Sequence, residues 1–158
     1  MKKYGVWFAL VCAVAAAPVS WAATPIAISA TRALAYGSFA AGSGGTVTLS
    51  AAGVRSASGG VILVPSGSWS AALFSVTGDP SVTYSITLPA NGVVSLTSGA
   101  NTMAVDNFTS NPSATTPSTG LLSAGGSQTL SVGATLSVGS NQASGSYSGS
   151  FSVTVNYP

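Results

Sequence analysis

The strongest constraint on the fold is a two-residue alternation of side chains near the carboxyl end of the chain. Tyr147, Phe151, Val153, Val155 and Tyr157 share one parity, and every position of the opposite parity between them carries serine, threonine or asparagine. Successive side chains of a β-strand point to opposite faces, so this register gives one apolar face and one wettable face. The pattern predicts a half-buried strand over residues 145–157.

The same alternation recurs through the chain between short turns rich in glycine. Phe108 breaks the parity that Met103 and Val105 share, so we expect an irregular strand there. No stretch after residue 22 sustains a helical period. Short alternating segments separated by turns predict an all-β fold, an antiparallel immunoglobulin-like or pilin-like β-sandwich in a single domain. The expected strands are 46–50, 82–88 and 129–138, with weaker candidates at 61–64, 70–77, 93–96 and 102–108, and a polar loop at 110–120.

The amino-terminal residues have the layout of a secretory signal peptide. Lys2 and Lys3 precede an apolar run, and Pro18 and a small-residue cleavage site ending at Ala22 follow it. The run is shorter than the roughly 20 apolar residues that a membrane anchor needs, so no membrane span is expected after cleavage. The chain then divides into a signal peptide at 1–22, an extended candidate donor strand at 23–33 and a β-sandwich domain at 34–158.

The residues after the leader lack the side chains on which most enzymes depend. They contain no histidine, cysteine, lysine or glutamate, and Asp79 and Asp106 are their only carboxylate side chains. General acid–base catalysis needs a group that titrates near neutral pH, and a serine without a partner base is a weak nucleophile. Zinc lacks its usual ligands here, and two carboxylates are few for a calcium site. We therefore expect a protein that is not an enzyme and has no cofactor.

The charge that remains after loss of the leader also excludes a class of partner. Arg32 and Arg55 balance the two aspartates, so the formal charge of residues 23–158 is zero and no basic patch is available for nucleic acid. Cys12, the chain's one cysteine, lies within the leader, so no internal disulfide is expected. Trp69 could stack on a sugar, although a core position is the more frequent role of one tryptophan in a sandwich.

The two ends of the domain look complementary. Ile26, Ile28 and Ala30 share one parity in the segment that follows the leader, before Arg32 interrupts it. At the other end, the chain finishes on an apolar-faced strand that only Pro158 could blunt. Proteins usually protect such an edge with lysine or proline, and an unprotected edge is a pairing site.

The carboxyl-terminal strand resembles the end motif of chaperone-usher pilus subunits. Gly145 is fourteenth from the end and Tyr157 is penultimate, with alternating apolar residues between them. In that family the sandwich lacks its last strand, and a periplasmic chaperone and then the next subunit's amino-terminal extension fill the groove. The resemblance implies a donor segment carrying Ile26, Ile28 and Ala30, and a groove lined by Gly145, Tyr147, Phe151, Val153, Val155 and Tyr157.

Most of the chain after the leader also resembles an uncharacterised family of secreted bacterial β-sandwich proteins related to spore coat protein U and fimbrial subunits. The matching stretches include LAYGSF, GTVTLSAAGVRSASGGV, YSITLP and SGSYSGSFSVTVNY. Many pilins and coat relatives carry a disulfide that this chain lacks, and its candidate donor strand is short.

These observations predict a non-enzymatic structural subunit that is exported through the periplasm to the cell surface, a fimbrium or the medium. It would form fimbria-like fibres by β-strand addition, with further copies of itself and a periplasmic chaperone as partners. The alternative is a self-complete monomeric module at the surface or in the periplasm. In that case the amino-terminal strand pairs with its own carboxyl-terminal strand, and the ligand could be a glycan.

Overall fold

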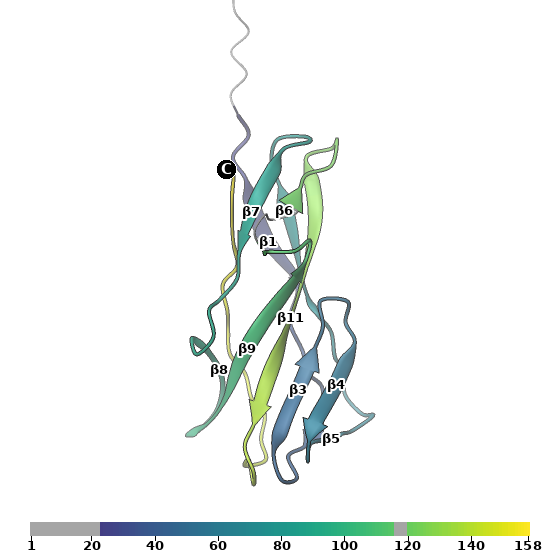
Figure 1. The fold of residues 1–158 in the computed structure, drawn as a ribbon, viewed down its shortest axis with the longest axis vertical. Coiled ribbons are helices and arrows are strands. Elements are labelled where there is room, and N and C mark those ends of the chain that lie inside the picture. Colours follow the sequence, from purple (N-terminus) through teal and green to yellow (C-terminus); the bar gives the residue numbers. More distant parts are fainter. Residues whose placement is uncertain (1–22, 116–119) are drawn as a thin grey trace, which may run out of the picture.

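The computed structural model describes residues 23–115 and 120–158 (Figure 1). The predicted signal peptide, residues 1–22, lies outside the described residues. Every regular element of the described chain is a β-strand. The strands are β1 (Ala27–Arg32), β2 (Phe39–Ala40), β3 (Gly45–Leu49), β4 (Arg55–Gly59), β5 (Ile62–Leu63), β6 (Ala72–Thr77), β7 (Thr83–Thr87), β8 (Val94–Ser98), β9 (Asn101–Asn111), β10 (Gly120–Leu121), β11 (Ser127–Val138) and β12 (Thr154–Asn156).

The longest strand, β11, organises the sheets. β6 pairs with its first half, β3 pairs with its second half, and β9 pairs across its middle. The main sheet runs β1-β6-β11-β3-β4, with the β8–β9 hairpin joined to β11. A second sheet has the order β10-β7-β12, and β2 pairs with β5. All of these pairings are antiparallel, so the predicted all-β antiparallel sandwich is confirmed.

The hydrophobic core follows from the alternation in β11. From Leu130 to Val138 its residues of one parity are all buried and contribute to two adjacent apolar clusters. Leu130 and Val132 pack with Tyr84 and Ile86 of β7 in the upper cluster of Figure 1. The lower cluster joins β3, β8, β9 and the second half of β11, and its members include Val47, Leu49, Met103, Val105, Ala134 and Leu136.

The predicted strands at 46–50, 82–88 and 129–138 are present. The strand predicted over 145–157 is wrong for most of its length, because only Thr154–Asn156 is a strand and the rest pairs through one bridge at Ser148. One predicted irregularity has a structural cause. Between Gly133 and Thr135 of β11, the pairing with β9 shifts from Thr109 to Asp106, so β9 carries an extra residue. Asn107 lies in this bulge with a positive φ of 51°. The bulge explains why the parity of Met103 is broken in the second half of β9.

Three strands were missed because they carry no apolar alternation. β4, with the sequence RSASG, is an edge strand whose last four residues are exposed. β2 and β10 contain two residues each. The expected polar loop at 110–120 also begins later than predicted, because β9 continues to Asn111. In residues 23–115 and 120–158, no helix has the length and hydropathy needed to cross a membrane.

Gly133 is the point at which β11 changes partners and where a side chain has no room. A Cβ atom there would overlap the carbonyl oxygen of Leu49 and the backbone of Ser50. Because this obstacle is backbone, we expect Gly133→Ala to lower the free energy of unfolding by about 1–3 kcal/mol. Urea denaturation would measure it. The control is Gly125→Ala, where the nearest atom, Ser123 Oγ, is 3.7 Å from the added carbon. Equal stability of the two variants would contradict the assignment.

Candidate functional site

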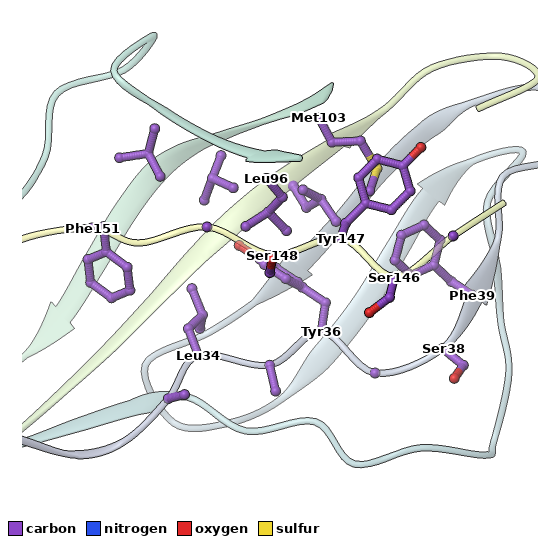
Figure 2. A pocket seen from close by; sticks show the side chains of 18 of the residues that line it. Leu34, Tyr36, Ser38, Phe39, Leu96, Met103, Ser146, Tyr147, Ser148 and Phe151 are labelled. Atoms are coloured by element: carbon purple, nitrogen blue, oxygen red, sulfur yellow. The ribbon is translucent and has the colours of Figure 1, made fainter. Parts of the chain in front are cut away.

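An open groove lies between the segment that follows β1 and the segment that leads to β12 (Figure 2). Its volume is about 1140 Å³. One wall is residues 32–41 and the other is residues 142–151. The floor belongs to the lower core cluster and includes Val94, Leu96, Met103, Val105 and Leu136. The lining is mainly apolar because the floor is part of the lower core cluster. The groove is thus an opening in the side of the sandwich.

The carboxyl-terminal wall is an extended segment that is paired along only one edge. Ser148 exchanges both backbone hydrogen bonds with Thr97, at 2.8 and 3.0 Å. Within residues 143–153, this is the only backbone pairing with another described residue. In an antiparallel ladder the neighbouring residues direct their backbone groups to the opposite edge. The N–H and C=O groups of Tyr147 and Gly149 therefore face away from β8 and have no backbone partner in the described chain.

The opposite wall is held firmly to the domain. Ala35 exchanges two backbone hydrogen bonds of 2.9 Å with Ser70. The Arg55 guanidinium donates to the carbonyl oxygens of Tyr36 at 2.9 Å and Val64 at 3.0 Å, and it stacks over the Trp69 ring at 4.1 Å. A planar guanidinium suits this combination of carbonyl bonds and stacking. The wall is thus preorganised before anything enters the groove.

A hydrogen-bonded contact joins the two ends of the chain beyond the groove. Tyr157 Oη accepts from the Asp79 N–H at 2.6 Å and donates to the Thr24 carbonyl at 3.0 Å. Asp79 Oδ1 in turn accepts from the Thr24 N–H at 2.7 Å. In Figure 1 the C-terminus accordingly lies beside the segment that leads into β1. This three-residue contact, here called the end clasp, lies at the β12 end of the domain.

The predicted site residues separate into two sets along this line. Gly145, Tyr147, Phe151 and Ala30 line the open groove. The others pack against the upper core cluster beyond the groove. They are Ile26, Ile28, Val153, Val155 and Tyr157.

In the described chain the candidate donor segment is already paired with another strand. β1 pairs with β6 of the same chain, with Ser29 opposite Ser75. No ladder joins β1 to β12 among the residues that the structure describes. The pairing of the two end strands, which the self-complete alternative assumes, is therefore absent from the described chain. The upper half of the space between the ends is filled by side chains, whereas the lower half is open.

Sequence reasoning missed much of the groove. Leu34 and Tyr36 continue the parity of Ile28, which was a usable signal for an inward-facing wall, but the floor residues come from distant strands. Trp69 is not a core residue: it is 43% exposed, and Arg55 occupies one face of its ring. The prediction of a core position for Trp69 is therefore wrong: the ring lies at the surface of this wall, where the Arg55 guanidinium stacks on it.

Tyr36 is the most unusual residue of the groove. Its side chain points into the groove in Figure 2, it is only 7% exposed, and its hydroxyl has no hydrogen-bond partner in the described chain. Burial raises the pKa of this hydroxyl. The second buried tyrosine of the described residues, Tyr84, also has a pKa raised by burial, but it donates to Gln128 Oε1 at 2.7 Å.

The charged side chains bind backbone groups. Asp106 Oδ1 accepts from the Gly92 N–H at 2.6 Å, and Arg32 Nε donates to the Ala71 carbonyl at 3.1 Å. The described residues hold no group of three or more side chains of the types that ligate metals. What the groove offers chemically is apolar contact, free backbone groups on one wall and one buried hydroxyl.

An antiparallel β-sandwich with an open groove beside its last segment is the class of protein that this geometry defines. The chain belongs to the family described as domain of unknown function DUF4402, whose match covers residues 26–157. This confirms the expected membership in an uncharacterised family. No curated protein and no solved structure matches the sequence significantly.

The Arg55 contacts predict a large cost for a conservative change. Arg55→Lys keeps the charge but loses the planar fork and the stacking on Trp69, so we expect the free energy of unfolding to fall by about 2 kcal/mol. Thermal unfolding and hydrogen exchange at residues 36–39 would detect the loosened wall. Arg32→Lys is the matched control, because its guanidinium makes a single carbonyl contact, and it should cost clearly less.

The two buried tyrosines predict a loss of stability in alkali. Both have pKa values above the ordinary 10.0, so the unfolded chain ionises first as the pH rises. Their contribution is complete below the unfolded pKa of 10.0 and is lost progressively above it. We expect the free energy of unfolding to fall above about pH 10, and Tyr36→Phe to flatten part of that decline. An unchanged alkaline slope in this variant would contradict the burial of the hydroxyl.

Proposed function

We propose that this protein is an exported, non-enzymatic structural subunit that assembles into fimbria-like fibres by accepting a β-strand from a second copy. The observation that carries the proposal is the open groove, whose carboxyl-terminal wall leaves the backbone groups of Tyr147 and Gly149 without backbone partners among the described residues. An unpaired edge above an apolar floor binds an extended chain through ladder bonds and alternate side chains.

The dimensions of the groove support an extended peptide as the occupant. Residues 145–151 of the wall span roughly 23 Å at about 3.3 Å per residue, which matches a strand of about seven residues. The lining offers apolar contact for one face of such a strand. The exposed serines Ser146, Ser148 and Ser150 also line the groove, so this wall adds hydroxyl groups to the apolar lining.

The donor we propose is residues 23–32 of a neighbouring copy. Within β1 every residue except Ile28 is exposed, and the strand is paired along one edge only. Segments with few buried apolar contacts open at low free-energy cost, so β1 is suited to exchange. In a neighbour's groove, Ile26, Ile28 and Ala30 would face the floor, and their backbone would meet the free edge at Tyr147.

Export and a chaperone complete the proposal. Residues 1–22 would direct the chain to the periplasm, where an open apolar groove is an aggregation hazard until a strand covers it. A periplasmic chaperone that lends a strand would provide that cover, as the resemblance to chaperone-usher subunits implies. The cell surface, a fimbrium or the medium is then the destination.

Two observations favour the alternative of a self-complete monomeric binding module. β1 is already paired in its own chain, and the end clasp ties Thr24 to Tyr157. In that case the groove would be a ligand site and β1 would never leave β6. Glycans are one candidate ligand, since the exposed face of Trp69 lies beside the wall.

A disulfide that locks β1 to β6 separates the two functions. Ser29 and Ser75 are opposite one another in the ladder, at a Cα separation within the range of disulfides, and residues 23–158 contain no cysteine. We expect oxidised Ser29→Cys/Ser75→Cys protein to stay monomeric and reductant to restore assembly. Size-exclusion chromatography and unboiled gel electrophoresis would follow both states.

The matched control is a staple in a part of the domain that takes no part in exchange. Thr46 and Ser58, on β3 and β4, have side-chain oxygens 2.7 Å apart. Thr46→Cys/Ser58→Cys should therefore oxidise easily and leave assembly intact. Assembly that persists with β1 locked would exclude it as the donor, and unmodified protein that remains monomeric at high concentration would favour the binding module.

A further inference from the structure

The hydroxyl of Tyr36 is the one polar side-chain atom of the described residues that is buried without a hydrogen-bond partner. A buried hydroxyl without a partner costs about 1–3 kcal/mol compared with one that is hydrogen-bonded. Such groups are rare in native proteins and usually have a functional explanation. In this protein the cost arises at Tyr36, which is also a residue that lines the groove.

The surroundings of Tyr36 leave the groove as the source of a partner. Its ring belongs to the lower core cluster, against which the apolar side chains of Leu34, Leu96 and Phe151 also pack. Its own carbonyl is occupied by Arg55, so the wall that carries it is fixed. Figure 2 shows the side chain reaching across the groove beneath the carboxyl-terminal segment. A chain inserted between the walls would therefore lie against this side chain.

We propose that Tyr36 is the polar specificity determinant of the groove: its hydroxyl donates a hydrogen bond to a main-chain carbonyl oxygen of the strand inserted from a second copy. This inference rests on the proposed function and adds the residue that selects the position of the strand. In residues 23–32, Ile26, Ile28 and Ala30 would face the floor, and Ser29 and Thr31 would face outward. Thr24, at the end of the segment, is the one inward-facing residue with a hydroxyl. Along the central residues a main-chain carbonyl is therefore the acceptor that remains.

The main effect of the hydroxyl would be on the register of the inserted strand, and its effect on the affinity of that strand would be smaller. Apolar side chains on an apolar floor tolerate a shift of two residues, because the same parity still faces inward. One buried donor removes that tolerance, since a shifted strand that fails to offer an oxygen leaves the hydroxyl unpaired. A single polar group in an apolar interface can thereby fix alignment.

The test uses the oxidised Ser29→Cys/Ser75→Cys protein as a monomeric receptor and a fluorescent peptide of the sequence ATPIAISATR as the probe. Tyr36→Phe in this receptor should weaken peptide binding roughly five- to tenfold, which corresponds to one hydrogen bond. The same change should raise the melting temperature of the empty receptor, because it removes the unpaired hydroxyl. Fluorescence anisotropy and thermal unfolding would measure the two effects, and circular dichroism would verify folding.

Tyr84→Phe is the matched control, because Tyr84 is as deeply buried but has its partner in Gln128 and does not line the groove. It should lower the melting temperature and leave peptide affinity unchanged. Equal affinity of the Tyr36 and Tyr36→Phe receptors would overturn the inference and leave the strand-accepting function intact. A peptide that binds neither receptor would overturn both the donor assignment and the role of Tyr36.

Discussion

Pairing along both edges of β11 is the constraint on which the remainder of the domain depends. One strand that pairs with β6, β3 and β9 fixes the order of the main sheet. Its buried residues then supply side chains to both core clusters, so this one strand connects the upper and lower halves of the sandwich. Gly133 makes the change of partners possible, because the chain leaving β3 passes where any side chain would stand.

The groove follows from what the opposite sheet lacks. β7 and β12 cover the upper cluster, whereas over the lower cluster the chain after residue 142 touches β8 through one pair of backbone bonds at Ser148. The lower core cluster is therefore covered on one side by a segment whose second edge has no backbone partner in the described chain. The contrast between Tyr84, whose hydroxyl is satisfied, and Tyr36, whose hydroxyl is not, places the unfinished part of the fold in this half.

Alternation along single strands was sufficient to predict the fold class, because parity is a local property. It identified the buried faces of β7 and β11 and the irregularity at Phe108. It also predicted the inward positions of Tyr147 and Phe151, but not that their strand would be paired over only part of its length. Pairing depends on which strand lies alongside, and no local pattern encodes that. For the same reason the sequence did not predict the hydrogen bonds from Arg55 to the carbonyl oxygens of Tyr36 and Val64. It did not predict the pairing of β1 with β6 either.

The packed upper half of the sandwich gives the groove a polarity. Beyond Phe151, which lines the groove, Val153 and Val155 pack in the upper core cluster, so the space between the walls is a blind channel that ends toward β12. A polypeptide would have to thread in from the Gly145 side and stop against the packed upper half. Successive molecules joined in this manner would all point the same way, so a filament built from them would have two chemically different tips.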